Sequence, residues 1–340
     1  MLVKLSALGD VVHSLPVLMA IRQQAPQSVI HWLAEETAAD LLVGHPALDR
    51  LWLSPRRSWR HGLVSGTQTT LKFWKEFRKE SYDVVLDLQG LIKSAIFVFL
   101  SRGVRKIGFG DEKEPAEWAL NEVLPAYDLE RHALERYLDL LMPLGLTRPQ
   151  VPLYGLEPSL DSLDYVRQNL GVKGDAPLLI LHPMALWDSK LWPSEHWEVL
   201  ARTLRNKGCQ VVFSGAQADQ PLISRLAAAS GTLDMAGKTN LQQLIALYSL
   251  ADLVVSTDTG TMHLAAALQK PVVALFGPTA PWRTGPYGSG HRVLRIGAPC
   301  SPCFMRKCPD PYCLGNIEPD QVVEAVNQML GEQHSAPVTR

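Results

Sequence analysis

The sequence contains no long hydrophobic run. Its best candidate, residues 95–100, is far shorter than the roughly 20 apolar residues that a membrane-spanning helix needs. A signal peptide is also missing, because the apolar stretch at residues 1–5 is brief and leads directly into Gly9 and Asp10. We therefore expect a cytoplasmic protein.

The sequence also lacks an excess of charge of either sign. It has 33 Lys and Arg against 34 Asp and Glu, a formal net charge of −1. This balance gives no overall attraction to nucleic acid or to an anionic membrane, so such contacts need a local patch. One candidate patch is the loop that contains Arg56, Arg57, Trp59 and Arg60. Its guanidinium groups could bind phosphate or carboxylate, or the loop could simply be solvated.

Cysteine is scarce, with five in 340 residues. Cys209 lies in a predicted strand and is expected in the core. The other four, Cys300, Cys303, Cys308 and Cys313, lie close together near the C-terminus. A cytoplasmic location disfavours disulfides, and four thiolates can bind zinc tetrahedrally, although the spacing is irregular for a zinc ribbon. A structural zinc site and reduced, metal-free cysteines both remain open.

The length and the order of apolar segments indicate two α/β domains. A chain of 340 residues favours two domains, and the proline-rich stretch 149–158 is suited to a linker. Short strand-like runs alternate with helical segments, which predicts largely parallel sheets. We expect two doubly wound, Rossmann-like halves facing a cleft, a domain over 1–157, a second over 158–330 and a tail at 331–340. The predicted strands are 2–5, 28–34, 83–88, 178–182, 209–214, 253–257 and 271–276, and the segment 124–145 is predicted to be helical.

The clearest candidate site follows the strand at 253–257. Asp258, Thr259, Gly260 and Thr261 connect this strand to a short helix that carries His263. Free N–H groups and the positive end of the helix dipole are expected to favour a phosphate there. The alternative is that Asp258 or Thr259 merely caps the helix.

Other strand ends carry polar residues with the same ambiguity. Asp10 follows the first strand and could be a helix cap or a general base. Lys190, between two tryptophans, could bind phosphate or be an exposed loop lysine. Gln217 could line an adenosine pocket or belong to an ordinary turn.

Five separated motifs resemble the family 9 glycosyltransferases, and within them the lipopolysaccharide heptosyltransferase I type. The resemblance covers about residues 1–330 and implies a GT-B fold. The first two motifs, together with residues 132–136, favour type I over type II. The motifs occupy residues 4–13, 87–94, 190–193, 258–263 and 276–279.

This resemblance implies inverting transfer of L-glycero-D-manno-heptose from ADP-heptose to the Kdo region of lipid A, at the cytoplasmic face of the inner membrane. It assigns Asp10 as general base and requires no metal ion for catalysis. Gln217 replaces a glutamate that is usual in type I, so the implied grip on the ribose is altered. The implied donor-binding residues are Lys190, Gln217, Asp258, Thr259, Gly260, Thr261 and His263. The implied acceptor-binding residues are Arg56, Arg57, Arg60, Gln89, Lys93 and Arg136.

Other functions share parts of this pattern. The cysteine cluster is more typical of type II and other family 9 members, so a related transferase with another acceptor or nucleotide-sugar donor is an alternative. A nucleotide-sugar epimerase has the same two-lobed architecture but does not need the segment 56–60. A metal-stabilised binding module would leave Asp10 and Lys190 without a role. No nucleic-acid partner is expected.

Overall fold

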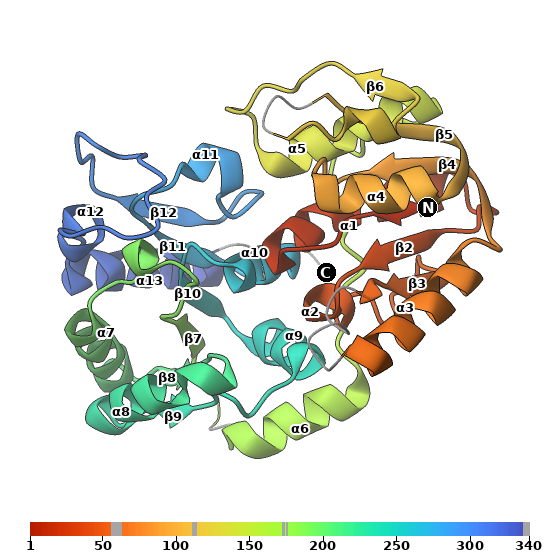
Figure 1. Ribbon diagram of the computed structural model, residues 1–340. Helices are drawn as coiled ribbons and strands as arrows, with labels where there is room; N and C mark the ends of the chain where they lie inside the picture. The colour runs from red at the N-terminus through yellow and green to blue at the C-terminus, as the bar shows by residue number, and fades with distance from the viewer. Residues whose placement is uncertain (56–62, 111–113, 172–173, 175, 336–340) are drawn as a thin grey trace. The chain divides into compact units, whose positions relative to one another are not determined.

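The chain folds into two compact units, which we describe separately. In the computed structural model, unit 1 is Met1–Gly155 and unit 2 is Leu156–Arg340 (Figure 1). The structure describes all residues except 56–62, 111–113, 172–173, 175 and 336–340.

Unit 1 contains a six-stranded sheet with the strand order β3-β2-β1-β4-β5-β6. All of its pairings are parallel, and β1 lies between β2 and β4. The strands are β1 (Leu2–Val3), β2 (His31–Ala34), β3 (Arg50–Leu53), β4 (Ser81–Asp87), β5 (Arg102–Phe109) and β6 (Glu122–Leu124).

Helices flank this sheet, and aromatic side chains fill much of its core. Phe73 and Trp74 of α3 pack against Trp52, Phe77 and Phe97, with Phe73 stacked on Phe77 and Trp74 stacked on Phe97. These contacts hold α3 and α4 together. The helices of unit 1 are α1 (Leu8–Gln24), α2 (Glu36–Ala39), α3 (Leu63–Phe77), α4 (Ile92–Leu100) and α5 (Ala133–Leu138), with 3₁₀ turns at Glu117–Ala119 and Asp139–Leu144.

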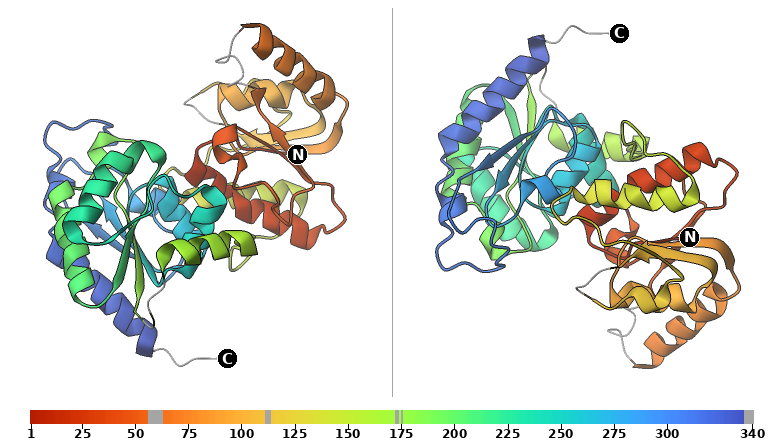
Figure 2. Two further views of the ribbon diagram at one scale, coloured as in Figure 1. Left: turned by 90° about the horizontal axis from the view of Figure 1, so that it is seen from below. Right: turned by 90° about the horizontal axis from the view of Figure 1, so that it is seen from above.

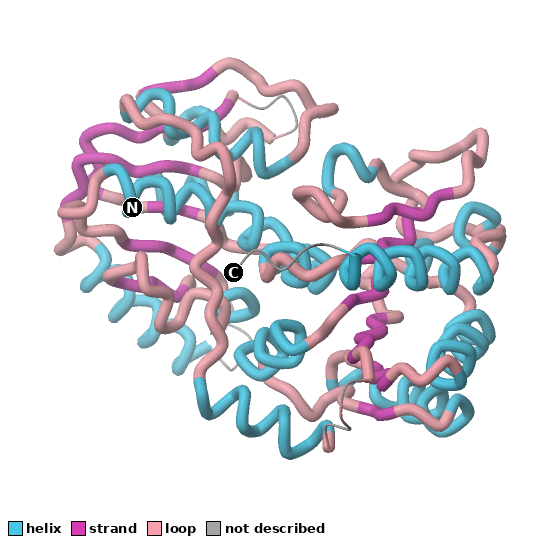
Figure 3. Tube along the Cα trace, turned by 180° about the vertical axis from the view of Figure 1, so that it is seen from behind, coloured by secondary structure: helices cyan, strands magenta, loops and turns pink. Residues whose placement is uncertain are grey.

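Unit 2 contains a second six-stranded parallel sheet, with the order β12-β11-β10-β7-β8-β9. Counted from its own first strand, this order is the same as in unit 1, and both match the doubly wound arrangement of dinucleotide-binding folds. Figure 3 shows the strands of each sheet side by side. The strands are β7 (Leu178–His182), β8 (Gln210–Phe213), β9 (Leu233–Asp234), β10 (Leu253–Thr257), β11 (Val272–Phe276) and β12 (Arg292–Arg295).

The long helix α13 closes the core of unit 2. It lies along the outside of the unit (Figure 2) and packs against α7 and β11. Its buried side chains, among them Val322, Val326 and Met329, join the same apolar core as Trp197 of α7 and Phe213 of β8. The helices of unit 2 are α6 (Leu160–Leu170), α7 (Ser194–Asn206), α8 (Gln220–Ser230), α9 (Leu241–Leu250), α10 (Gly260–Ala267), α11 (Pro281–Thr284), α12 (Tyr312–Gly315) and α13 (Pro319–Ser335), with 3₁₀ turns at Asp188–Lys190 and Gln217–Asp219.

The prediction of two Rossmann-like α/β halves is confirmed, but the prediction that the region 124–145 is helical is correct only from residue 133 onward. Strand β6 ends at Leu124, α5 covers Ala133–Leu138, and a 3₁₀ turn follows. Pro125 and Pro143 explain the interruption, because proline lacks the N–H that an α-helix interior requires. Sequence reasoning also missed β3, β5, β6, β9 and β12, whose residues are largely half-buried or polar.

Among the helices in the described ranges, none has both the length and the apolar character needed to cross a membrane.

Candidate functional site

Lys190 and Asp258 form a buried ion pair at the carboxyl edge of the unit 2 sheet. Asp258 follows β10 directly and is 4% exposed. Its carboxylate lies 2.7 Å from the Lys190 ammonium and accepts a 2.5 Å hydrogen bond from the Thr279 hydroxyl. The alternative interpretation of Lys190 as an exposed loop lysine is therefore wrong.

Neither Asp258 nor Thr259 caps α10 with its side chain. Thr259 is the N-cap residue, has extended backbone angles and makes no side-chain cap hydrogen bond. Gly260 and Thr261 form the first turn, where backbone N–H groups have no partner within the helix. His263 is buried on the same helix. The strand end therefore presents a helix N-terminus next to the ion pair, and anion binding there stays a prediction.

Trp187 and the cysteine-rich segment hold the loop that carries Lys190. The ammonium lies 4.5 Å from the centre of the Trp187 ring. The Ser189 hydroxyl donates to the Met305 carbonyl at 2.6 Å, and the Ser189 N–H donates to the Arg306 carbonyl. The Arg306 guanidinium lies 5.4 Å from the centre of the same indole ring, so two cations border Trp187. Sequence reasoning did not identify Arg306, because it lies over a hundred residues from the loop.

A buried polar chain supports the neighbouring strand ends. His182, the last residue of β7, contacts the Ser214 hydroxyl at 2.9 Å, and Ser214 lies 3.3 Å from the Tyr248 hydroxyl. Burial lowers the pKa of His182 to about 4, so this ring is neutral at pH 7. Gln217 lies beyond β8, where its amide donates to the Gln220 side chain at 2.7 Å.

The four C-terminal cysteines are all described, and none is in a disulfide. Burial raises the pKa of the Cys313 thiol, and the neighbouring Cys300 and Cys303 raise it further. Within the described part of the chain, no three His, Cys, Asp or Glu side chains are gathered so as to hold a metal ion. Zinc binding at Cys300, Cys303, Cys308 and Cys313 stays a prediction.

In unit 1, the polar residues of three segments meet at the carboxyl ends of β1 and β4. Gln89 accepts hydrogen bonds from the backbone N–H groups of Leu5 and Ser6 at 3.1 and 3.2 Å. Lys93 donates to the Ser6 hydroxyl at 2.6 Å. Asp10 is partly exposed in the first turn of α1 and accepts from the Ala7 N–H at 3.2 Å. The Asp10 carboxylate therefore helps to cap the N-terminus of α1, although Asp10 itself lies in the first turn of the helix and not at the N-cap position.

Two buried charges lie directly behind Asp10. Lys4 is 2% exposed and donates to the Leu88 carbonyl at 3.0 Å and to the Tyr137 hydroxyl at 2.6 Å. Burial lowers the pKa of Lys4, while the negative charges of Asp10 and Asp87 oppose that change. Burial raises the pKa of Asp87, which is held by N–H groups of Gln89 and Gly90 and by the Ser94 hydroxyl.

Arg136 is the third predicted acceptor-binding residue that the structure describes, after Gln89 and Lys93. The Arg136 guanidinium lies 4.5 Å from the centre of the Tyr127 ring. Tyr137, the next residue, was missed by sequence reasoning because a tyrosine at a helical position carries no distinctive pattern. Arg56, Arg57 and Arg60 lie outside the described residues.

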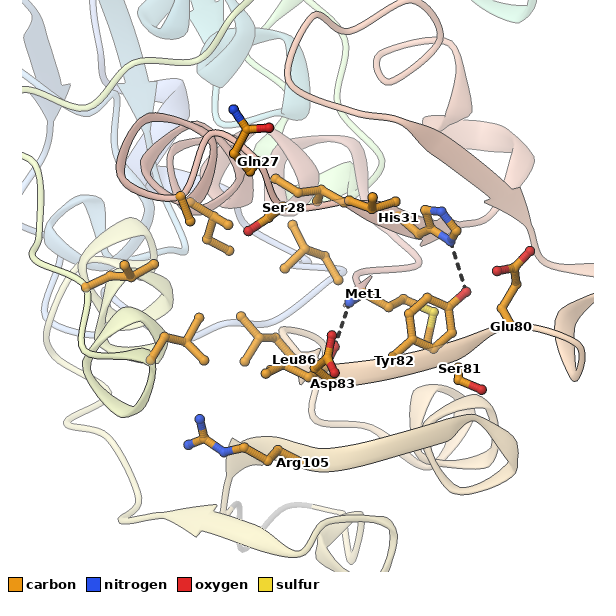
Figure 4. A pocket seen from close by; sticks show the side chains of 18 residues that line it. Met1, Gln27, Ser28, His31, Glu80, Ser81, Tyr82, Asp83, Leu86 and Arg105 are labelled. Atoms are coloured by element: carbon orange, nitrogen blue, oxygen red, sulfur yellow. Dashed lines mark hydrogen bonds between the residues drawn. The ribbon is translucent and has the colours of Figure 1, made fainter.

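A cavity of about 600 Å³ opens at the other end of the unit 1 sheet (Figure 4). It is lined by residues at the starts of strands, including Met1, His31 and Tyr82. Most of its lining lies at the amino ends of the strands, although Leu86, one residue before the end of β4, also lines it. Ligands of open α/β sheets bind at carboxyl edges, so we do not assign the cavity to the site.

Comparison with known proteins identifies the class. The model of glycosyltransferase family 9 (heptosyltransferase) matches residues 70–313. Two curated relatives are named lipopolysaccharide heptosyltransferase 1: that of Pseudomonas aeruginosa is 30% identical over 97% of each chain, and that of Escherichia coli K12 is 31% identical over 87% of this chain and 92% of its own. The solved structure of Escherichia coli heptosyltransferase WaaC with ADP superposes with a TM-score of 0.80 at 28% identity, covering 96% of this chain and 98% of that one.

The protein is therefore a glycosyltransferase with the GT-B type of fold. It belongs to glycosyltransferase family 9, the heptosyltransferase family, as the motifs predicted.

We expect substitutions of Lys190 and of Asp258 to have different effects on the affinity for ADP. Lys190→Ala should raise the Kd for ADP roughly tenfold or more, because a charge-assisted hydrogen bond contributes about 1.5–3 kcal/mol. Asp258→Asn should leave this Kd unchanged or lower it, since it removes the negative charge that pairs with Lys190. Isothermal titration calorimetry with ADP measures both.

Lys207→Ala, at an exposed lysine of the same unit, is the matched control and should bind ADP normally. If Lys190→Ala bound ADP with unchanged affinity, Lys190 would have only a structural role.

Proposed function

We propose that this glycosyltransferase moves L-glycero-D-manno-heptose from ADP-heptose to the Kdo region of lipid A, with inversion at the sugar carbon. The single observation that carries the proposal is the buried Lys190–Asp258 pair next to the N-terminus of α10. Two relatives named as type 1 heptosyltransferases, and a WaaC structure solved with ADP, support the choice of donor and reaction.

On the donor side, Lys190 and the N–H groups at Thr259 and Gly260 hold the diphosphate. An ammonium has three N–H donors, so Lys190 can bind a phosphate oxygen while it remains paired with Asp258. These groups stabilise the charge that grows on the departing ADP. Asp258 then accepts hydrogen bonds from heptose hydroxyls, while Thr261 and His263 support the turn and Gln217 faces the adenosine. Catalysis requires no metal ion on this account, because the lysine and the helix N-terminus supply the positive charge.

On the acceptor side, Asp10 takes the proton from the attacking hydroxyl. It is partly exposed and its carboxylate is oriented by the Ala7 N–H, which suits a general base. Lys93 and Arg136 bring positive charge to this edge, and Gln89 holds the loop before α1 in place. Arg56, Arg57 and Arg60 remain predicted acceptor-binding residues from the sequence.

The acceptor is a lipid, so we place the enzyme at the cytoplasmic face of the inner membrane as a peripheral protein. The cysteine cluster supports one alternative, a type II or other family 9 transferase that uses a different acceptor or donor. A structural zinc at these cysteines is compatible with either. A nucleotide-sugar epimerase is the more distant alternative.

An assay with a choice of acceptors tests the proposal. The purified protein is incubated with ADP-heptose and either Kdo2-lipid A or Kdo2-lipid A that already carries one heptose, and ADP release and product mass are followed. We expect one heptose to be added to Kdo2-lipid A only. Transfer to the heptosylated acceptor alone would identify a type II enzyme, and ADP-heptose consumption without any acceptor would contradict a transferase mechanism.

Asp10→Asn should separate catalysis from capping. Asparagine keeps an oxygen that can accept from the Ala7 N–H, so the fold is expected to be preserved. Because the general base is lost, kcat should fall roughly 10²-fold or more, with the Kd for ADP unchanged. Steady-state kinetics and a thermal unfolding curve of the same preparation give both numbers. Near-normal turnover by Asp10→Asn would remove Asp10 from the mechanism.

A further inference from the structure

The cysteine-rich segment, residues 300–313, contacts the loops on both sides of the buried ion pair in unit 2. On one side, the Ser189 hydroxyl donates to the Met305 carbonyl at 2.6 Å, and the Ser189 N–H donates to the Arg306 carbonyl at 3.3 Å. Ser189 is buried and directly precedes Lys190. These two hydrogen bonds fix the backbone of Arg306 next to the loop that carries the lysine.

On the other side, the same segment holds the turn that follows β11. The N–H groups of Cys303 and Phe304 both donate to the Pro278 carbonyl, at 3.0 and 2.8 Å. The next residue, Thr279, donates its hydroxyl to Asp258. The cysteine-rich segment is therefore attached by hydrogen bonds beside each member of the ion pair.

The Arg306 side chain lies at the same indole ring as the Lys190 ammonium. Its guanidinium carbon is 5.4 Å from the centre of the Trp187 ring, and the ammonium nitrogen is 4.5 Å from that centre. The two cations are thus separated by at most the sum of these distances. A diphosphate that accepts a hydrogen bond from each cation can bridge such a separation.

The charges at this edge of the sheet call for a further cation. Lys190 is paired with Asp258, so the net charge of the pair is zero, whereas the diphosphate of a nucleotide sugar is a polyanion. Arg306 is exposed, and in the part of the chain that the structure describes no carboxylate forms an ion pair with its guanidinium. Arg306 therefore brings a positive charge that no neighbouring acidic residue neutralises.

We propose that Arg306 is a further donor-binding residue, whose guanidinium binds the diphosphate of the nucleotide sugar together with Lys190. A guanidinium can bind two phosphate oxygens at once, while the Lys190 ammonium is shared with Asp258. This inference rests on the proposed function, in which Lys190 and the start of α10 hold the diphosphate.

Arg306→Gln removes the charge and keeps a long polar side chain. We expect the Kd for ADP to rise roughly fivefold, the upper end for an exposed ion pair. AMP should lose less affinity than ADP, and adenosine should lose none because it has no phosphate. Isothermal titration calorimetry of the full chain, with displacement titrations for the weaker ligands, measures all three. Added salt should narrow the difference between the variant and the wild type for ADP.

Two further variants make the result specific. Lys307→Gln is the matched control, because it removes the same charge from the adjacent exposed residue, and it should bind ADP like the wild type. Arg306→Lys keeps the charge, so it should recover most of the ADP affinity that Arg306→Gln loses.

Wild-type ADP affinity in Arg306→Gln would overturn the inference. Equal losses for ADP and adenosine would also overturn it, because they indicate an altered loop and not a lost phosphate contact. The same holds if Lys307→Gln weakens ADP binding as much, or if Arg306→Lys binds no better than Arg306→Gln. These outcomes leave the proposed function intact, whereas an absence of transfer from ADP-heptose in the acceptor assay contradicts the proposed function itself.

Discussion

The parallel direction of the strands is the constraint on which the rest of this structure depends. In both sheets every described pairing is parallel, so the carboxyl ends of the strands meet at one edge of each sheet. Parallel strands need a crossover connection, usually a helix, and most of the helices here follow the end of a strand. Short loops at that edge therefore bring side chains from distant parts of the sequence next to helix N-termini.

The two units use that edge to hold positive charge in different ways. In unit 2, Lys190 pairs directly with Asp258 at 2.7 Å, and the pair stays close to the N-terminus of α10. In unit 1, Lys4 is more deeply buried and contacts a carbonyl and a phenol. Moving an ammonium out of water costs several kcal/mol unless hydrogen bonds and opposite charge offset it. Both sites meet this requirement.

The sequence allowed several strands and the polar residues that follow them to be predicted, but not the contacts between distant segments. The strands at 178–182 and 253–257 were predicted with the bounds observed, since they are continuous apolar runs bordered by polar residues. The half-buried strands β5 and β12 carry charges that hide their pattern. Asp10, Lys190 and Asp258 could be proposed because each follows a predicted strand. Tyr137 and Arg306 could not, because their importance comes from contacts between segments that no local pattern specifies.

The most direct test of the account is a crystal structure of the protein with ADP bound, because it locates the ligand relative to the strand ends. The account predicts diphosphate oxygens within hydrogen-bond distance of the Lys190 ammonium and of the first N–H groups of α10. ADP bound at the amino ends of the strands, for example in the cavity lined by Met1, His31 and Tyr82, would contradict it.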